Sequence, residues 1–200
     1  MHNSADDRQT ELPQVDRQGL TCTIGNRQRF AVEFEIHNEV PKVWNETWGS
    51  LWLWVEGHLV GRRHETEMIS IGLDSLRETA NENLEAASRI LATYDAKRAL
   101  QAVMWSRYGG TEIPATEGLT TDELLSAAEV LPRTTGPFFD GWEAVLLDEG
   151  EEERFIYREG EGQVYESKWP SGTFKGVIGV AKGEFERLAR AKLNDTNSIS

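Results

Sequence analysis

Cysteine is nearly absent from this chain, which has only Cys22 among its 200 residues. An intrachain disulfide and a thiolate metal cluster are therefore excluded, and a reducing compartment is the expected environment. Long apolar runs are also missing, since the longest aliphatic and aromatic stretch is Leu51 to Val55. The start of the chain lacks the basic and apolar regions of a signal peptide. We expect a cytoplasmic protein without a membrane-spanning segment.

Basic residues are in the minority. Lys and Arg number 21 against 34 Asp and Glu, which gives a formal net charge of −13. An electronegative surface repels nucleic-acid phosphates and anionic lipids, and it attracts basic partners at rates that fall with added salt. We therefore expect no binding to nucleic acid or membranes. Two interpretations of the charge stay open: solubility alone, or recognition of a basic protein.

Motifs of metal binding and catalysis are missing as well. Among the four histidines, His58 and His64 come nearest to a metal cluster together with Glu65 and Glu67, but they lack the helical i, i+4 pairing of HExxH. No GxSxG or GxxxxGK(S/T) occurs, and EGEGQ is typical of a hairpin turn. We predict no metal, no cofactor and no enzyme activity. The enzymatic alternative is a carboxylate site assembled from distant segments.

The length fits a single domain flanked by tails. Residues 1–18 are polar and show no apolar period, and residues 194–200 are similar. We expect both segments to be disordered and the domain to span 19–193.

The first half of the domain has the pattern of strands. LTCTIG is strand-like, and RFAVEFEI places its aromatic and branched residues on one face by strict alternation. Glu33 and Glu35 fall on the other face, which we expect to be solvated rather than to form a catalytic pair.

The stretch WGSLWLWVEGHLVG carries three of the seven tryptophans. Trp48, Trp52 and Trp54 share one face of the predicted strand, and the other face is also apolar, so the rings either fill a core or contact a partner. We favour a sheet-on-helix core for Trp52 and Trp54, and expect Trp48 to reach solvent. Glu56 and Gly57 predict a tight hairpin turn.

The middle of the chain is predicted to be helical. Ser75 and Glu78 have the spacing of a capping box ahead of an apolar stripe, and Asp95 is a second predicted cap. Thr120 and Glu123 form another box, opening a short helix that Pro132 ends.

The last third returns to strands in WEAVLL, ERFIYRE and QVYESKW. GTFKGVIGV is predicted to be a final strand and EFERLARAKL a closing helix. This order predicts an α+β domain with a largely antiparallel sheet, helices inserted between two strand groups and a C-terminal helix, rather than a doubly wound α/β sheet.

The segment DEGEEER concentrates negative charge before the second of these strands. Glu159 and Glu161 follow across the next turn, and only Arg154 and Arg158 oppose them. Like charges at close range stabilise nothing by themselves, so this is either a solvated loop or a surface that a basic partner neutralises. The residues concerned are Asp148, Glu149, Glu151, Glu152 and Glu153.

The order RFAVEFEI, WG, LWLWVEG and LVG, followed by FFDGWEAVLL, ERFIYRE and PSGTFKGVI, resembles a family of bacterial polymorphic-toxin immunity proteins of the contact-dependent inhibition type. The similarity covers most of residues 28–193. The long polar N-terminal tail and a helical region extended over 92–131 depart from it. The resemblance implies a small cytosolic α+β protein that binds and neutralises the C-terminal domain of one cognate toxin, and it provides no catalytic residues.

Under that resemblance, a negative surface would attract a basic toxin such as a nuclease. The candidate contacts are the five carboxylates of 148–153 and Trp48. A carboxylate-dependent hydrolase and a small-molecule or peptide sensor remain the alternatives.

Overall fold

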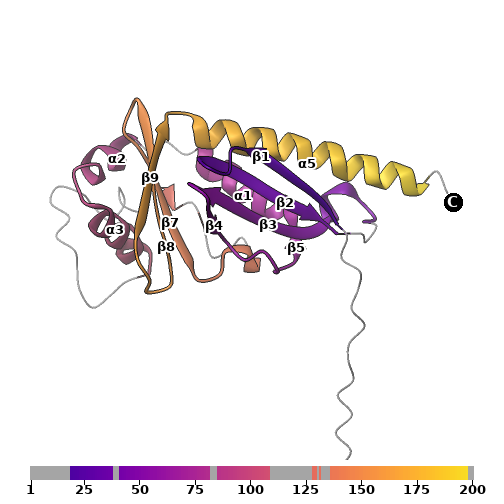
Figure 1. Cartoon of the computed structure of the whole chain (residues 1–200), viewed down its shortest axis with the longest axis horizontal. Helices are drawn as coiled ribbons and strands as arrows, with labels where there is room; N and C mark the ends of the chain where they lie inside the picture. The colour runs from indigo at the N-terminus through magenta and orange to yellow at the C-terminus, as the bar shows by residue number, and fades with distance from the viewer. Residues whose placement is uncertain are drawn as a thin grey trace, which may run out of the picture.

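The computed structural model describes residues 19–37, 41–81, 85–108, 128–129, 131 and 136–197. In this part of the chain, two antiparallel sheets lie side by side with helices around them (Figure 1). The predicted tail over 1–18 and the capping box of Thr120 and Glu123 lie outside the described residues. The α+β class with antiparallel pairing is confirmed, although the strands divide between two sheets.

The first five strands form one sheet, in the order β1-β2-β3-β4 with β5 also paired to β3. A two-residue turn closes the β3–β4 hairpin, where Glu56 and Gly57 have φ of 49° and 83°. Positive φ at both positions is the geometry of a type I′ turn, so the predicted hairpin is confirmed. The strands are β1 Leu20–Gly25, β2 Phe30–Ile36, β3 Trp48–Val55, β4 His58–Val60 and β5 Glu67–Met68.

One face of this sheet packs on α1 (Ile69–Asn81) and α5 (Thr173–Asn197). Alternation places Phe34 and Leu51, which are register partners, on that face, and the Phe34 ring meets Phe185 of α5 edge-on at 5.8 Å. The tryptophans of β3 lie on the opposite face. Trp52 is buried, as predicted, but the prediction that it fills the sheet-on-helix core is wrong, since leucines and Val55 fill it.

Glu33 on this opposite face is 1% exposed, so the prediction of a solvated position is wrong for this residue. Its carboxylate accepts hydrogen bonds from Thr23 Oγ1 at 2.8 Å and Trp54 Nε1 at 3.0 Å, and it pairs with Arg27. Three partners compensate the charge for the loss of water.

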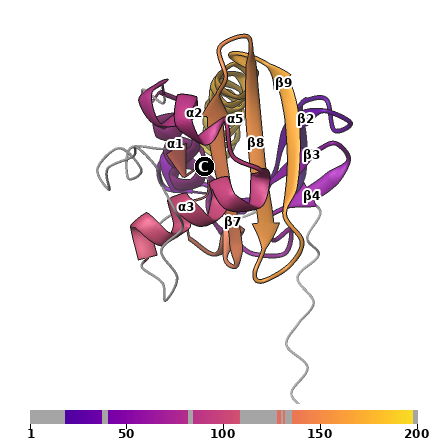
Figure 2. The same cartoon turned by 90° about the vertical axis from the view of Figure 1, so that its left-hand side faces the viewer.

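The second sheet has the order β6-β7-β8-β9 and is covered on both faces. Val145 and Ile156 face α2 (Glu85–Leu91) and α3 (Ala96–Tyr108), while Leu146 and Phe155 join the core shared with α1 and α5. Figure 2 shows α2 and α3 on one side of these strands and the other sheet beyond them. The strands are β6 Ala128–Glu129, β7 Trp142–Asp148, β8 Glu152–Glu159 and β9 Tyr165–Pro170.

Aromatic rings join the two sheets. Phe30 of β2 stacks on Trp169 of β9 with centroids 4.9 Å apart and lies 5.3 Å from Phe174 of α5. Ring pairs of this geometry add to the free energy gained from burial alone. The two sheets therefore share one core and belong to one folded unit.

Several helix boundaries differ from the prediction. Helix α1 begins at Ile69, before the capping box expected at Ser75, because the carbonyls of Thr47 and Asn45, which lie just before β3, accept hydrogen bonds from Ile69 N and Ser70 Oγ. Asp95 is confirmed as a cap, since its Oδ1 accepts from Arg98 N at 2.9 Å.

Ala128–Glu129 form β6, so the helix predicted to end at Pro132 does not include them. Short 3-10 turns occur at Trp44–Glu46 and Gly136–Phe139.

The segment GTFKGVIGV belongs to α5 and is not a strand. The buried residues Phe174, Ile178, Ala181, Phe185 and Ala189 recur at intervals of three and four, which is the helical period. The helix continues to Asn197, so residues 194–197 are helical where a tail was expected.

Candidate functional site

The predicted acidic segment forms the turn between β7 and β8. Gly150 takes a φ of +93°, which favours glycine, and Glu149 N donates to the Glu152 carbonyl at 2.8 Å. Ser171 N donates to the Glu151 carbonyl at 2.9 Å, and Asp148 N donates to Ser88 Oγ of α2 at 2.9 Å. The backbone of this turn is therefore tied to the neighbouring strand and to a helix. We call residues 148–152 the acidic hairpin.

Three carboxylates of the acidic hairpin are exposed, namely those of Asp148, Glu151 and Glu152. Asp148 Oδ1 accepts a hydrogen bond from Gly150 N at 2.9 Å, which stabilises the turn. In the described part of the chain, Glu151 and Glu152 have no side-chain partner. These two residues leave uncompensated negative charge at the tip of an anchored turn.

Glu149 is neutralised within the molecule. Its carboxylate accepts from Lys168 Nζ of β9 at 2.6 Å and lies 3.8 Å from Arg154 NH1. Arg154 is itself buried and donates to Glu166 at 2.6 Å and to the Tyr94 carbonyl at 2.9 Å. Lys168 could not be predicted as the partner of Glu149, because their pairing depends on the β8–β9 register.

Glu153 must be removed from the candidate contacts. Its side chain is only 7% exposed. The carboxylate accepts hydrogen bonds from Trp169 Nε1 at 2.7 Å, Gly172 N at 2.8 Å and Phe174 N at 2.8 Å. It therefore compensates the unpaired amides at the start of α5, where a negative charge also interacts favourably with the helix dipole.

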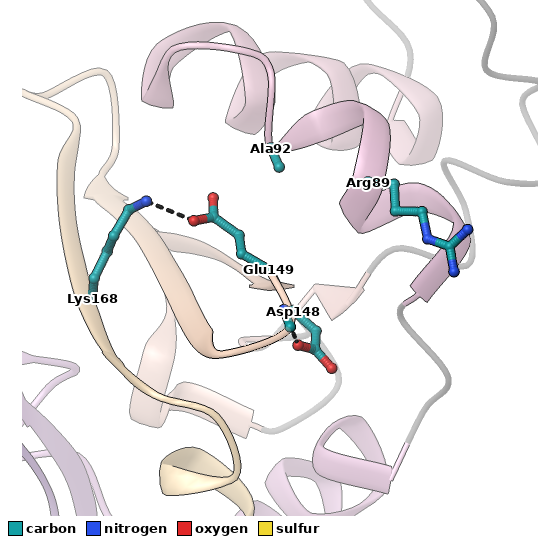
Figure 3. Close-up of a pocket in the computed structure, with 6 residues that line it drawn as sticks. Arg89, Ala92, Asp148, Glu149 and Lys168 are labelled. Atoms are coloured by element: carbon teal, nitrogen blue, oxygen red, sulfur yellow. Dashed lines mark hydrogen bonds and ion pairs between the residues drawn. The ribbon is translucent and has the colours of Figure 1, made fainter.

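A cavity of about 510 Å³ lies between the acidic hairpin and α2. Figure 3 shows Lys168 reaching from β9 to Glu149 across one side of it, with Ala92 and Arg89 on the helix side. Asp148 and Gly150 complete its lining. The cavity is lined by both signs of charge and offers hydrogen-bonding groups to a polar side chain of a partner.

Trp48 lies apart from the acidic hairpin, in the other sheet, where it pairs with Met68 of β5. It is 43% exposed, so the prediction that it reaches solvent is confirmed. The structure does not join Trp48 and the acidic hairpin into one patch. Any partner that contacts both has to span the two sheets.

The described residues contain neither a metal-ligand cluster nor a membrane-spanning helix. No group of three or more His, Cys, Asp or Glu side chains there is placed to hold a metal ion. No described helix is long and apolar enough to cross a membrane.

Residues 22–183 match the sequence model of a family described as Immunity protein 42. The chain belongs to this family. The match includes both sheets, the acidic hairpin and the first part of α5. Membership of the Immunity protein 42 family gives the chain the role of a toxin-neutralising inhibitor that binds a cognate toxin, and it confirms the resemblance found in the sequence.

Among solved structures, the fold is similar to that in the crystal structure of CdiI from Burkholderia dolosa AUO158. The TM-score is 0.57 at 16% identity, and the alignment covers 82% of this chain and 99% of that chain. At this identity the similarity shows a common fold. No curated protein matches the chain.

Proposed function

We propose that this Immunity protein 42 family member neutralises a basic, nuclease-type toxin domain by placing the acidic hairpin at the toxin's active site. The observation that carries the proposal is the pair of exposed carboxylates of Glu151 and Glu152, which lack side-chain partners in the described part of the chain. A nuclease cleft has to attract phosphates, so it also attracts carboxylates held at a rigid turn.

The structure of the hairpin supports this use. Its backbone is fixed by hydrogen bonds to Ser88 and Ser171, so little conformational entropy is lost when a partner binds. Within the hairpin, Glu149 is neutralised by Lys168, so the carboxylates without a side-chain partner among the described residues are those of Glu151 and Glu152 at its tip. The net charge of −13 extends the attraction beyond the contact itself.

Neutralisation through binding requires no cofactor and no turnover of a substrate. The inhibitor acts where the toxin acts, which for a nuclease is the cytoplasm. The fold shared with CdiI supports a toxin system of the contact-dependent inhibition type.

Co-expression tests the proposed function. The C-terminal domain of the protein encoded by the adjacent gene is tested as the toxin domain, and it is expressed in a sensitive bacterium with and without the full chain. We expect growth only with the chain present, and co-purification of the two proteins in a stable complex. Growth arrest despite full expression of the folded chain would refute toxin neutralisation.

A further inference from the structure

Within the described residues, Trp52 and Arg63 are two donors without an acceptor on the outer face of the five-stranded sheet. We define this outer face by Trp48, Trp52 and Trp54 of β3, with Arg63 and Met68 beside them. In Figure 1, α1 lies behind the sheet and no described helix crosses the face turned to the viewer.

The indole of Trp52 is buried. The side chain is 0% exposed, and its Nε1 has no hydrogen-bond partner in the part of the chain that the structure describes. Buried N–H groups in folded proteins are nearly always paired, because an unpaired donor has lost its water without a replacement. Its neighbour Trp54 shows the usual arrangement, since its Nε1 donates to Glu33 at 3.0 Å.

The guanidinium of Arg63 lies above the Trp52 ring. The Arg63 guanidinium carbon lies 5.1 Å from the centre of the Trp52 ring. Arg63 is exposed, and among the described residues it has no carboxylate partner. By contrast, Arg27 stacks on Trp54 at 5.2 Å and also pairs with Glu33. The Trp54 side of the face therefore contains an internal carboxylate, and the Trp52 side does not.

We propose that the outer face binds a carboxylate-bearing segment of the cognate toxin domain, with Arg63 and Trp52 Nε1 as its donors. A carboxylate satisfies both groups at once, just as Glu33 satisfies Arg27 and Trp54. Arg63 lies over the ring, so a carboxylate that binds its guanidinium is brought close to the Trp52 side chain. This inference rests on the proposed function for the identity of the partner, but it concerns a surface separate from the acidic hairpin.

The surroundings of the pair fit a protein partner. Trp48 is 43% exposed on the same face, and Met68 is its register partner. Tryptophan, arginine and methionine are enriched at the centres of protein interfaces, where large side chains give contact area and charged donors give specificity. A domain that is basic overall still carries carboxylates on its surface, so this contact is compatible with the proposed toxin.

The experiment follows the Trp52 indole directly. The full chain, labelled with ¹⁵N, is titrated with a catalytically inactive form of the toxin domain encoded next to it. Among the seven tryptophan indole signals, that of Trp52 is identified by its loss in Trp52→Phe. We expect this signal to move downfield on binding, because the N–H gains an acceptor.

Affinity measurements on variants complete the test. We expect Arg63→Ala to weaken toxin binding about tenfold, and Trp52→Phe, which keeps a ring but removes the donor, to weaken it severalfold. Arg29→Ala is the matched control, because Arg29 is an exposed arginine at the β1–β2 turn with no side-chain partner among the described residues. The remaining indole signals show whether each variant keeps its fold.

Three results would overturn the inference. If the toxin domain binds while the Trp52 signal stays in place and Arg63→Ala binds normally, the outer face is not a contact, and the proposed function stands. If the Trp52 signal moves but Arg63→Ala binds normally, the partner group is not a carboxylate. If the toxin domain does not bind at all, the proposed function and this inference both fail.

Discussion

At the scale of single residues, acidic side chains that are neighbours in the sequence have different environments in the fold. Glu153 lies in a run of acidic residues, yet its carboxylate receives one indole and two backbone donors that come from residues 169–174. Glu151 and Glu152, two positions and one position earlier, receive no side-chain donor from the described residues. Whether each carboxylate is available to a partner thus depends on contacts with residues that are distant in the sequence.

Substituting Glu153 tests this distinction. Glu153→Gln keeps the size of the side chain but removes the charge and one acceptor oxygen at the start of α5. We expect the free energy of unfolding to fall by about 2–4 kcal/mol, as for other buried charge-assisted networks. Urea denaturation measures it, with Glu152→Gln as the exposed control that stays within about 0.5 kcal/mol of the native chain. Equal effects of the two substitutions would contradict the capping role.

Tyr157 provides a prediction about pH. Burial, followed by the nearby Glu56 and Tyr165, raises the pKa of its phenol from 10.0 to about 12. Because the folded pKa lies above the unfolded one, the contribution of the neutral phenol is present below pH 10 and is lost as the pH rises through about 12.

We therefore expect one of the four tyrosines to ionise only near pH 12 in a phenolate absorbance titration. Tyr157→Phe should remove that late step. The native chain should also lose more stability than Tyr157→Phe between pH 10 and 12. A titration in which all tyrosines ionise together near pH 10 would show that Tyr157 is not held in a buried environment.

At the scale of elements, α5 is the clearest difference between sequence and structure. Val177, Ile178 and Val180 are β-branched, and Gly176 and Gly179 are poor helix formers, which is why the segment suggested a strand. The helix forms because its apolar stripe packs on β2 and α1, and this tertiary contact outweighs local propensity.

Gly→Ala substitutions are expected to stabilise the protein in α5 and to destabilise it in α1. Gly176, Gly179 and Gly183 are exposed, and a Cβ added to any of them meets nothing within 4 Å. We expect each Gly→Ala change to stabilise the protein by about 0.5–1 kcal/mol, because alanine loses less backbone entropy in a helix. Thermal denaturation of the triple variant measures the sum.

Gly72 of α1 is the matched control for these substitutions. A Cβ there would lie 2.6 Å from Leu51 Cδ2 and 3.1 Å from Phe138 Cδ2, so Gly72→Ala should destabilise the protein by about 1–3 kcal/mol through overpacking. Stabilisation at Gly72 would mean that α1 and the sheet are less closely packed than described. Destabilisation by the α5 changes would mean that their face is covered.

At the scale of the whole molecule, local patterns were sufficient for the longer strands of both sheets, the α+β class and the Glu56-Gly57 hairpin, because period-two alternation and positive-φ turns depend on neighbouring residues. They were not sufficient for the short strands β5 and β6 or for the segment at the start of α5. The split into two sheets, the burial of Glu33 and the use of Glu153 as a cap depend on residues that meet only in the fold. The acidic hairpin could be located from composition. Its internal pairing of Glu149 with Lys168 could not, because that pairing follows from the register of β8 and β9.

We propose that an electronegative surface centred on the acidic hairpin recognises a basic toxin domain. Variants that change the charge of the molecule test this proposal. Two variants have the same change in net charge: Glu151→Lys with Glu152→Lys at the hairpin, and Glu159→Lys with Glu161→Lys at the next turn. All four residues are exposed. The two variants therefore separate a local contact from the overall field.

The most direct measurement is calorimetric titration of the toxin domain into the native chain and both variants over a range of salt concentrations. We predict that the affinity of the native chain falls with salt, that the hairpin variant binds at least about tenfold more weakly at low salt, and that the control variant changes by less than about threefold. Affinity that is independent of salt and equal in all three proteins would contradict electrostatic recognition through the acidic hairpin.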